Sequence, residues 1–298
     1  MEKARIGRNI NISDGLITSP EYAAKIGCTA FQIFLSSPRQ NHTKARLLSE
    51  LKELSEKLLE FDQILVIHGS YVINLCHKKD TSKYSLSLSS LCQDLNATFH
   101  LGKRCLGVII HMGKNIKGND MTEDQAISNY ISGLKDALSR TPKETTIILE
   151  TGASQGTEVG SQVTDLAKIY NGLTTEEKKR VKFCIDTCHI WATGYDISTK
   201  DGVVRFFKRF DKMIGVDNIV CIHFNDSKTG LGSFVDRHAD LGYGKIGLEG
   251  LEHIALYALK KSIPIIMETP LDSVNPETNK DITFSEQNAL IKKWLGIQ

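Results

Sequence analysis

The sequence predicts an α/β fold in which eight strands alternate with helices around one closed sheet. Short apolar runs of strand length recur at intervals of about 25 to 45 residues, with amphipathic segments between them. Runs such as Ile64–Ile67 and Gly107–Ile110 are apolar throughout, which indicates strands buried on both faces, as in a parallel sheet. No linker or internal repeat interrupts the pattern. We therefore expect a single (β/α)₈, or TIM, barrel domain over residues 1–298.

The expected strands are rich in Ile, Val and Leu, and polar or glycine-bearing segments bound them. Several end in a histidine or an acidic residue. In chain order the predicted strands are Ala4–Ile12, Ala30–Leu35, Ile64–His68, Leu106–His111, Thr146–Glu150, Lys182–Asp186, Ile219–Phe224 and Pro264–Glu268.

Segments between the strands carry helix signals. Arg46–Phe61 places leucines at three- and four-residue spacing, which predicts a helix packed on the barrel. Thr122–Gln125 and Thr283–Glu286 match the capping box that opens a helix. The serine-rich segment Ser82–Ser90 is too short for a linker, and its leucines lead us to expect the approach to another helix.

Composition excludes several classes of protein. The net charge of +2 and pI near 8.1 do not suit a polycationic nucleic-acid binder, so any phosphate contact must be local. Seven cysteines without a CxxC pair indicate reduced thiols rather than a disulfide framework. No apolar run reaches the ~18 residues of a membrane span. We expect a soluble intracellular monomer, cytoplasmic or nuclear, or packaged with DNA if the source is viral.

Metal-type ligands stand at the ends of six successive predicted strands. In a barrel of this class the carboxyl ends of the strands form the functional face, so these side chains should meet. Imidazole and carboxylate ligands suit Zn²⁺, Mn²⁺ or Fe²⁺. The nine candidates are His68, His111, Glu150, Asp186, His223 and Glu268 at strand ends, with His189, Asp236 and His238 in adjoining loops.

Each of these residues taken alone is more simply explained by packing or by a solvated loop. An uncompensated cluster of acids and imidazoles would be costly to bury, however, and bound ions remove that cost. Nine ligands suit about three ions, and closely spaced ions favour phosphodiester hydrolysis over a one-metal reaction. The other four histidines, which we assign to ordinary surface or packing roles, are His42, His77, His100 and His253.

Four motifs resemble a known family. They are His68–Leu75, Leu149–Gly156, Cys184–His189, and His223–Lys228 continuing through Asp236–His238 to Gly242–Ile246. Over nearly its whole length the chain resembles endonuclease IV, the metal-dependent apurinic/apyrimidinic (AP) endonucleases of base-excision repair. The combination of D-T-C-H with H-x-N-D-S-K and D-R-H is specific to that family.

The resemblance implies a TIM barrel with about three zinc ions, with Mn²⁺ as an alternative at one site. Glu150 would bridge two ions, and Glu150, Asp186 and Glu268 would be the catalytic carboxylates. By this resemblance one ion is held by His68, His111 and Glu150, a second by Glu150, Asp186, His223 and Glu268, and a third by His189, Asp236 and His238.

The resemblance also implies the reaction and the substrate. Metal-activated water would attack the phosphate on the 5′ side of an abasic sugar in duplex DNA, leaving a 3′-hydroxyl and a 5′-deoxyribose phosphate. Blocked 3′ ends are expected as further substrates. Arg39, Tyr71 and Val72 match positions that the family inserts at the lesion. We expect four cationic side chains at the same mouth to neutralise phosphates; the alternative for each is an ordinary solvated side chain. They are Lys114, Lys228, Arg237 and Lys245.

Three positions depart from the family pattern. Asn9 stands where a histidine is common, Ala153-Ser154 replaces an Ala-Gly pair, and Val72 is shorter than the expected leucine. Two rival interpretations stay open on the residues alone. One is a sugar isomerase or epimerase on a similar barrel, which needs fewer histidines and has no use for the Arg39 and Tyr71 loops. The other is a lesion-binding protein without catalysis, which the intact ligand set disfavours.

Overall fold

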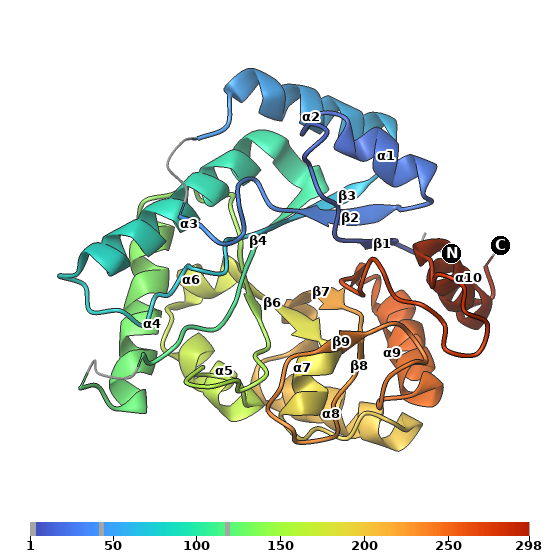
Figure 1. The fold of residues 1–298 in the computed structure, drawn as a ribbon. Coiled ribbons are helices and arrows are strands. Elements are labelled where there is room, and N and C mark those ends of the chain that lie inside the picture. The colour runs from blue at the N-terminus through green and yellow to red at the C-terminus, as the bar shows by residue number, and fades with distance from the viewer. Residues whose placement is uncertain (1–3, 42–44, 117–119, 298) are drawn as a thin grey trace.

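A computed structural model describes residues 4–41, 45–116 and 120–297. Eight parallel strands form the predicted TIM barrel, with helices around its outside (Figure 1). The strands pair in the order β1-β10-β7-β6-β5-β4-β3-β2. They are β1 (Ile6–Arg8), β2 (Ala30–Ile33), β3 (Ile64–His68), β4 (Cys105–Ile110), β5 (Ile147–Glu150), β6 (Val181–Asp186), β7 (Ile219–His223) and β10 (Ile265–Met267).

The barrel closes where β1 meets β2. The Thr29 amide donates to the Ile6 carbonyl at 2.8 Å, and the Ile10 amide donates to the Gln32 carbonyl at 2.8 Å. A β-carbon added at Gly7 would lie 1.5 Å from the Ala30 carbonyl oxygen, so only glycine permits this approach of the two backbones.

Helices follow most of the strands, as the alternating pattern predicts. The capping boxes are present: the Thr122 and Thr283 hydroxyls accept hydrogen bonds from the Gln125 and Glu286 amides at 3.2 Å. Two 3₁₀ turns, η1 (Gly102–Arg104) and η2 (Val216–Asn218), lead into strands. The helices are α1 (Ser19–Lys25), α2 (Leu48–Glu60), α3 (Ser82–Leu101), α4 (Glu123–Ser139), α5 (Val163–Asn171), α6 (Thr175–Lys179), α7 (Thr187–Ala192), α8 (Lys200–Met213), α9 (Leu248–Lys261) and α10 (Phe284–Leu295).

The structure corrects several predicted boundaries. β1 is shorter than the predicted Ala4–Ile12: it ends at Arg8, and Asn9 makes only an isolated bridge to Gln32. The Asn11 side chain then accepts the Ser13 amide at 2.9 Å and turns the chain. β2 ends before Leu35, whose side chain is buried in the following loop, so the apolar run there marks burial rather than pairing. Ser82–Ser90 is not an approach to a helix but the first half of α3.

A short antiparallel hairpin after β7 was not predicted. It joins β8 (Asp226–Ser227) to β9 (His238–Ala239) beside α7 (Figure 1). His42 lies outside the described residues, whereas His77 lies in a loop and His100 and His253 lie in helices, as expected. Across the described part of the chain, no helix is both long and apolar enough to cross a bilayer.

Inside the barrel, one buried apolar residue from each of seven strands contributes to a compact layer. Side chains alternate between the two faces of a strand, so the residue two positions later also points into the barrel. Each layer member is followed at that spacing by a polar side chain. The layer is Ala30, Val66, Ile109, Ile148, Cys184, Cys221 and Ile266, and the polar residues above it are Gln32, His68, His111, Glu150, Asp186, His223 and Glu268.

Candidate metal centre

All nine candidate ligands lie together at the carboxyl end of the barrel. Six come from the polar layer at the strand ends, and His189 comes from the first turn of α7. Asp186 caps that helix, because its Oδ1 accepts the His189 amide at 2.9 Å. Asp236 and His238 are supplied by the β8–β9 hairpin. The side chains form three groups within which the potential ligand atoms lie within 4.8 Å of one another.

Glu150 lies at the centre of the cluster and is almost fully buried. Its Oε2 is 3.3 Å from Nε2 of His68 and also 3.3 Å from Nε2 of His111. Its Oε1 is 2.8 Å from Nδ1 of His223. Burial favours the neutral acid, but the imidazoles of His111 and His223 hold the pKa of Glu150 well below its ordinary value. The two carboxylate oxygens thus face two different groups of histidines.

The second and third groups adjoin Glu150. Oε2 of Glu268 is 3.2 Å from Nδ1 of His223, and Oδ2 of Asp186 is 3.9 Å from the same nitrogen. Asp236 lies between two imidazoles, with Oδ2 at 3.2 Å from His189 Nε2 and Oδ1 at 3.2 Å from His238 Nε2. Each carboxylate therefore shares its group with at least one imidazole.

Backbone carbonyls fix the orientation of three imidazoles. Nδ1 of His68 donates to Gly69 at 2.7 Å, Nδ1 of His189 donates to Thr151 at 2.6 Å, and Nδ1 of His238 donates to the Glu268 carbonyl at 3.2 Å. Each bond leaves Nε2 directed at the centre, where it offers a lone pair once the ring is neutral. This is the arrangement that proteins use to present histidine to a metal.

Four buried atoms at the centre have no hydrogen-bond partner among the described residues. Such atoms are rare in folded proteins because leaving them unpaired is costly. Bound cations would satisfy these atoms, and nitrogen and carboxylate donors suit zinc or a similar divalent ion. The residues therefore fit a metal centre. The atoms are Nε2 of His68, His189 and His238, and Oε2 of Glu150.

Nearby cysteines are weak competitors for an ion. Cys184 and Cys221 lie near His223, and Cys188 lies near Asp186 and His238, within the same 4.8 Å limit. Burial raises the pKa of Cys188 to about 12 and that of Cys184 well above its usual value. The thiolate is the form that binds metal, so Cys184 and Cys188 are poor ligands at neutral pH.

Sequence reasoning missed the side chains that support the ligands. Gln32 accepts from Nε2 of His223 at 2.7 Å and donates to Oε1 of Glu268 at 2.7 Å. Asn225 donates to Oδ2 of Asp186 at 2.9 Å and accepts the Glu268 amide at 2.8 Å. The signal for Gln32 was a lone amide inside an apolar strand. Asp226 organises the adjoining loop by accepting the amides of Ser227, Gly242, Gly244 and Ile246.

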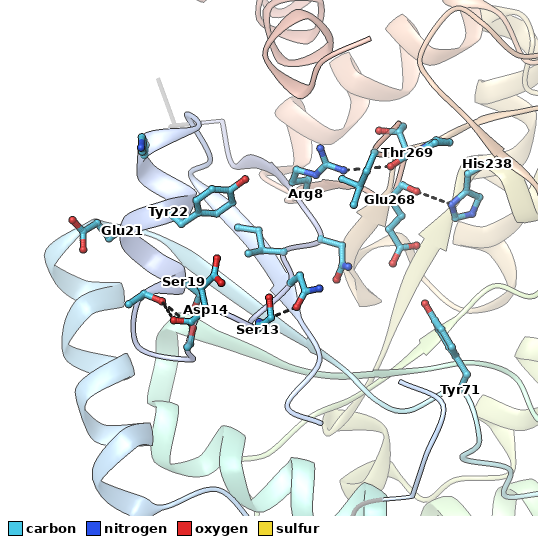
Figure 2. A pocket seen from close by; sticks show the side chains of 18 residues that line it. Arg8, Ser13, Asp14, Ser19, Glu21, Tyr22, Tyr71, His238, Glu268 and Thr269 are labelled. Atoms are coloured by element: carbon cyan, nitrogen blue, oxygen red, sulfur yellow. Dashed lines mark hydrogen bonds between the residues drawn. The ribbon is translucent and has the colours of Figure 1, made fainter. Parts of the chain in front are cut away.

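Two hollows border the centre and share Tyr71, His238 and Glu268. One, of about 430 Å³, is also lined by His111, His189 and Asp236. The other, of about 790 Å³, extends over the loop between β1 and α1. Figure 2 shows this second hollow, with Tyr71, Glu268 and His238 at one side and Tyr22 and Glu21 of α1 at the other.

Tyr71 and Val72 are exposed above the cluster, where the resemblance places the lesion-contacting side chains. The Tyr71 ring meets those of Phe34 and His111 edge-on, with centroids 5.2 and 5.3 Å apart. Its amide donates to the Pro38 carbonyl at 2.8 Å, which joins the loop after β3 to the loop that carries Arg39. Arg39 itself is exposed.

The four predicted phosphate contacts fall into two groups. Lys114 and Arg237 line the 430 Å³ hollow. Lys228 and Lys245 are exposed but line neither hollow; they lie by the hairpin, where the Lys228 amide donates to the Arg237 carbonyl at 2.9 Å. DNA contact by any of them stays a prediction.

Two departures from the family pattern have a structural outcome. Asn9 lies beside the supporting amide, since its Oδ1 accepts from Nε2 of Gln32 at 3.3 Å. Ser154 has a φ of 58°, so the backbone keeps the left-handed conformation that suits the usual glycine. Its amide donates to Oγ of Ser161 at 3.1 Å, and Glu150 remains in place.

Comparisons with known proteins agree with this geometry. The family model described as "Xylose isomerase-like TIM barrel" matches residues 20–291. A protein of Acanthamoeba polyphaga mimivirus named as an endonuclease 4 is 60% identical over 98% of this chain and 93% of its own length. The apurinic-apyrimidinic endonuclease 1 of Saccharomyces cerevisiae is 33% identical over 92% of this chain and 73% of its own.

The chain belongs to the endonuclease 4 family. The crystal structure of endonuclease IV from Thermus thermophilus superimposes with a TM-score of 0.78 at 29% identity, over 98% of this chain and 99% of that one. Membership confirms the resemblance and the expectation of a nuclease. A D-tagatose 3-epimerase-like protein also superimposes, with a TM-score of 0.68 over 98% of this chain and 97% of that one, but 16% identity shows a shared fold alone.

Proposed function

We propose that this member of the endonuclease 4 family is an AP endonuclease that hydrolyses the phosphodiester 5′ to an abasic site in duplex DNA. The products would be a 3′-hydroxyl and a 5′-deoxyribose phosphate, with removal of blocked 3′ ends as a further activity. The yeast relative, at 33% identity, is named for apurinic and apyrimidinic sites, which supports this substrate.

The proposal assigns three zinc ions to the three side-chain groups. His68, His111 and Glu150 would hold one ion, and His189, Asp236 and His238 would hold another. Asp186, His223 and Glu268 would hold the remaining ion together with Glu150, which would thus be shared with the first ion. The observation that carries this assignment is the grouping of the nine ligands into three sets whose ligand atoms lie within 4.8 Å of one another. The four buried, unpaired atoms belong to the set of His68 and the set of His189. Mn²⁺ has the same preference for nitrogen and oxygen donors and would be tolerated at one site.

Bound ions would supply a nucleophilic water at neutral pH and would neutralise the phosphodiester. The chain's own residues hold that centre in one geometry. Glu150 presents one oxygen to each of two groups, and Gln32 accepts the Nε2 hydrogen of His223, so that Nδ1 of this ring faces Glu150 and Glu268. Asn225 holds Asp186 through a side-chain hydrogen bond of 2.9 Å. A site fixed in this way needs little rearrangement when substrate binds.

Side chains at the mouth would select the damaged nucleotide. Tyr71 and Val72 would fill the gap in the opened duplex, since an extruded nucleotide leaves a vacancy in the base stack. Arg39 and the four lysine or arginine side chains at the mouth would contact the backbone. Because the overall charge is only +2, these local cations would have to provide the attraction to phosphate.

A gel assay on a duplex with one abasic-site analogue tests the proposal. We expect a single incision on the 5′ side of the analogue, lost after treatment with a chelator and recovered with Zn²⁺. Glu150→Gln should not incise but should still bind the duplex, because the change removes charge from the centre and not from the mouth. Incision that persists in chelator, or near-normal turnover by Glu150→Gln, would refute the proposal.

A further inference from the structure

The loop of the β8–β9 hairpin exposes a side chain at every third position. Lys228, Leu231, Phe234 and Arg237 are all exposed, so two cations flank two apolar side chains. Leu231 is 44% exposed and Phe234 is 51% exposed. The segment 228–237 holds a single acidic residue, Asp236, which belongs to the candidate metal centre. This surface is therefore apolar at its tip and positive at its base.

Phe234 adopts a backbone conformation that is unfavourable for its side chain. Its φ is 55°, in the left-handed region, which is rare for a bulky aromatic residue. The half-exposed ring recovers little of this cost by burial. Strain of this kind persists where the surrounding structure enforces it, and it is concentrated at functional sites.

Hydrogen bonds from α7 enforce the conformation of the tip. The amides of Gly232 and Phe234 donate to the carbonyls of Trp191 and Ala192 at 3.1 and 3.0 Å. Nε1 of Trp191 donates to the Thr229 carbonyl at 2.9 Å. The same short helix carries His189, and Figure 1 shows α7 beside β8 and β9. The tip is thus fixed to the element that positions a candidate ligand.

The tip also lies next to the candidate metal centre along the chain. Phe234 precedes Asp236 by two residues, a separation of at most about 7 Å between their α-carbons. The Asp236 amide donates to Oε1 of Gln155 at 3.0 Å, which ties this side of the hairpin to the loop after β5. Arg237, at the base of this surface, lines the 430 Å³ hollow beside the centre, so the loop borders the place where the phosphate would lie.

We propose that Leu231 and Phe234 make an apolar contact with DNA beside the incised phosphate, while Lys228 and Arg237 bind the adjoining phosphates. This inference rests on the proposed function and adds a second contact to that of Tyr71. Apolar side chains inserted at base steps and aromatic rings stacked on bases are common modes of DNA contact. We infer DNA rather than a protein partner because Lys228 and Arg237 carry the charge that phosphates require, and the surface borders the candidate metal centre.

The test uses the full-length zinc-loaded protein and a nicked product duplex. This DNA carries a 3′-hydroxyl and a 5′ tetrahydrofuran residue at the nick, so its binding can be measured whether or not the protein incises. We expect Phe234→Ala and Leu231→Ala each to weaken binding by roughly tenfold in fluorescence anisotropy. The salt dependence of Kd should not change, because neither side chain is charged.

Phe234→Gly separates binding from stability. Glycine suits a φ of 55°, so this variant should melt no lower than the parent protein yet bind the nicked duplex as weakly as Phe234→Ala. Phe99→Ala is the matched control, since Phe99 is an exposed aromatic near the end of α3, at the opposite end of the barrel, and its loss should leave binding unchanged.

Binding by Phe234→Ala and Phe234→Gly within about twofold of the parent protein would overturn the inference. A second result would also overturn it: the parent protein self-associates with increasing concentration in sedimentation, and Phe234→Ala abolishes this self-association without affecting DNA binding. The apolar side chains would then bind protein. A parent protein that binds the nicked duplex through Phe234 but never incises abasic DNA would support the contact and refute the proposed function alone.

Discussion

Gln32 accepts the Nε2 hydrogen of His223 at 2.7 Å, although the two residues lie 191 positions apart on non-adjacent strands. Both side chains are fully buried, and Gln32 also donates to Glu268. One amide thus fixes the tautomer of a candidate ligand and the orientation of another. Such supporting bonds are worth about 10- to 100-fold in metal affinity in known sites.

Gln32→Leu should therefore lower the affinity for zinc by roughly 10- to 100-fold while the barrel still folds. The measurement is competition of the zinc-loaded protein with a chromophoric chelator. Gln63→Leu is a matched control. Gln63 is equally buried but lies just before β3, at the other end of the barrel, where its amide donates to the Pro20 and Cys28 carbonyls. If both variants lose zinc alike, Gln32 has no specific role at the centre.

Metal loading should release protons at neutral pH. Burial opposes a charged His238, but Asp186 and Asp236 raise its pKa to about 9, so the metal-free imidazole is protonated at pH 7. The pKa of His111 is lowered to about 4, chiefly by burial, so that ligand is already neutral. Only a neutral imidazole binds metal, hence zinc affinity should rise as the pH increases from 7 through 9. Despite burial, neighbouring carboxylates also raise the pKa of His189 and His223 well above its ordinary value, so these ligands add to the proton release.

Calorimetric titrations in two buffers with different ionisation enthalpies would measure this release. The apparent enthalpy of zinc binding at pH 7 should differ between the buffers in proportion to their ionisation enthalpies. Identical enthalpies in both buffers would mean that the histidines are already neutral before the metal binds.

Ser154→Gly should stabilise the protein. A φ of 58° places Ser154 in the left-handed region, where glycine avoids a cost of about 1–2 kcal/mol but adds up to ~1 kcal/mol of entropy to the unfolded chain. The expected net gain is therefore about 0.5–1 kcal/mol in chemical denaturation. Ser154→Ala keeps the β-carbon and should show no gain. A Ser154→Gly variant less stable than the parent would show that the hydroxyl makes a compensating contact.

Tyr71→Ala should weaken binding to abasic duplex by roughly ten- to a hundredfold, since an aromatic contact with a base is worth ~1–3 kcal/mol. Zinc content should not change.

Val72→Leu restores the longer side chain and should bind equally or better, whereas Arg39→Ala should lose affinity in a salt-dependent way. A blocked 3′ terminus at a nick needs no extrusion, so these losses should be smaller on it. Parent-like binding and cutting by both alanine variants would place lesion selection in the metal pocket.

Much of the fold followed from the sequence because strand ends and apolar runs are local features. Alternation along each strand places Glu150 above Ile148 and His223 above Cys221, so the strand-end ligands could be predicted together. The same spacing from Ala30 would have indicated Gln32. The hairpin tip at Phe234 could not be predicted, because a left-handed φ in a bulky residue depends on hydrogen bonds from α7, far away in the chain.

The central claim is that three ions at the nine-residue cluster carry out incision. Zinc titrated into the metal-free protein, with incision of abasic duplex followed at each step, tests it most directly. We expect activity to rise until about three equivalents per chain are bound and then to stay constant, because nine ligands without thiolate saturate about three sites. Full activity at one equivalent, or activity without added metal, would contradict the account.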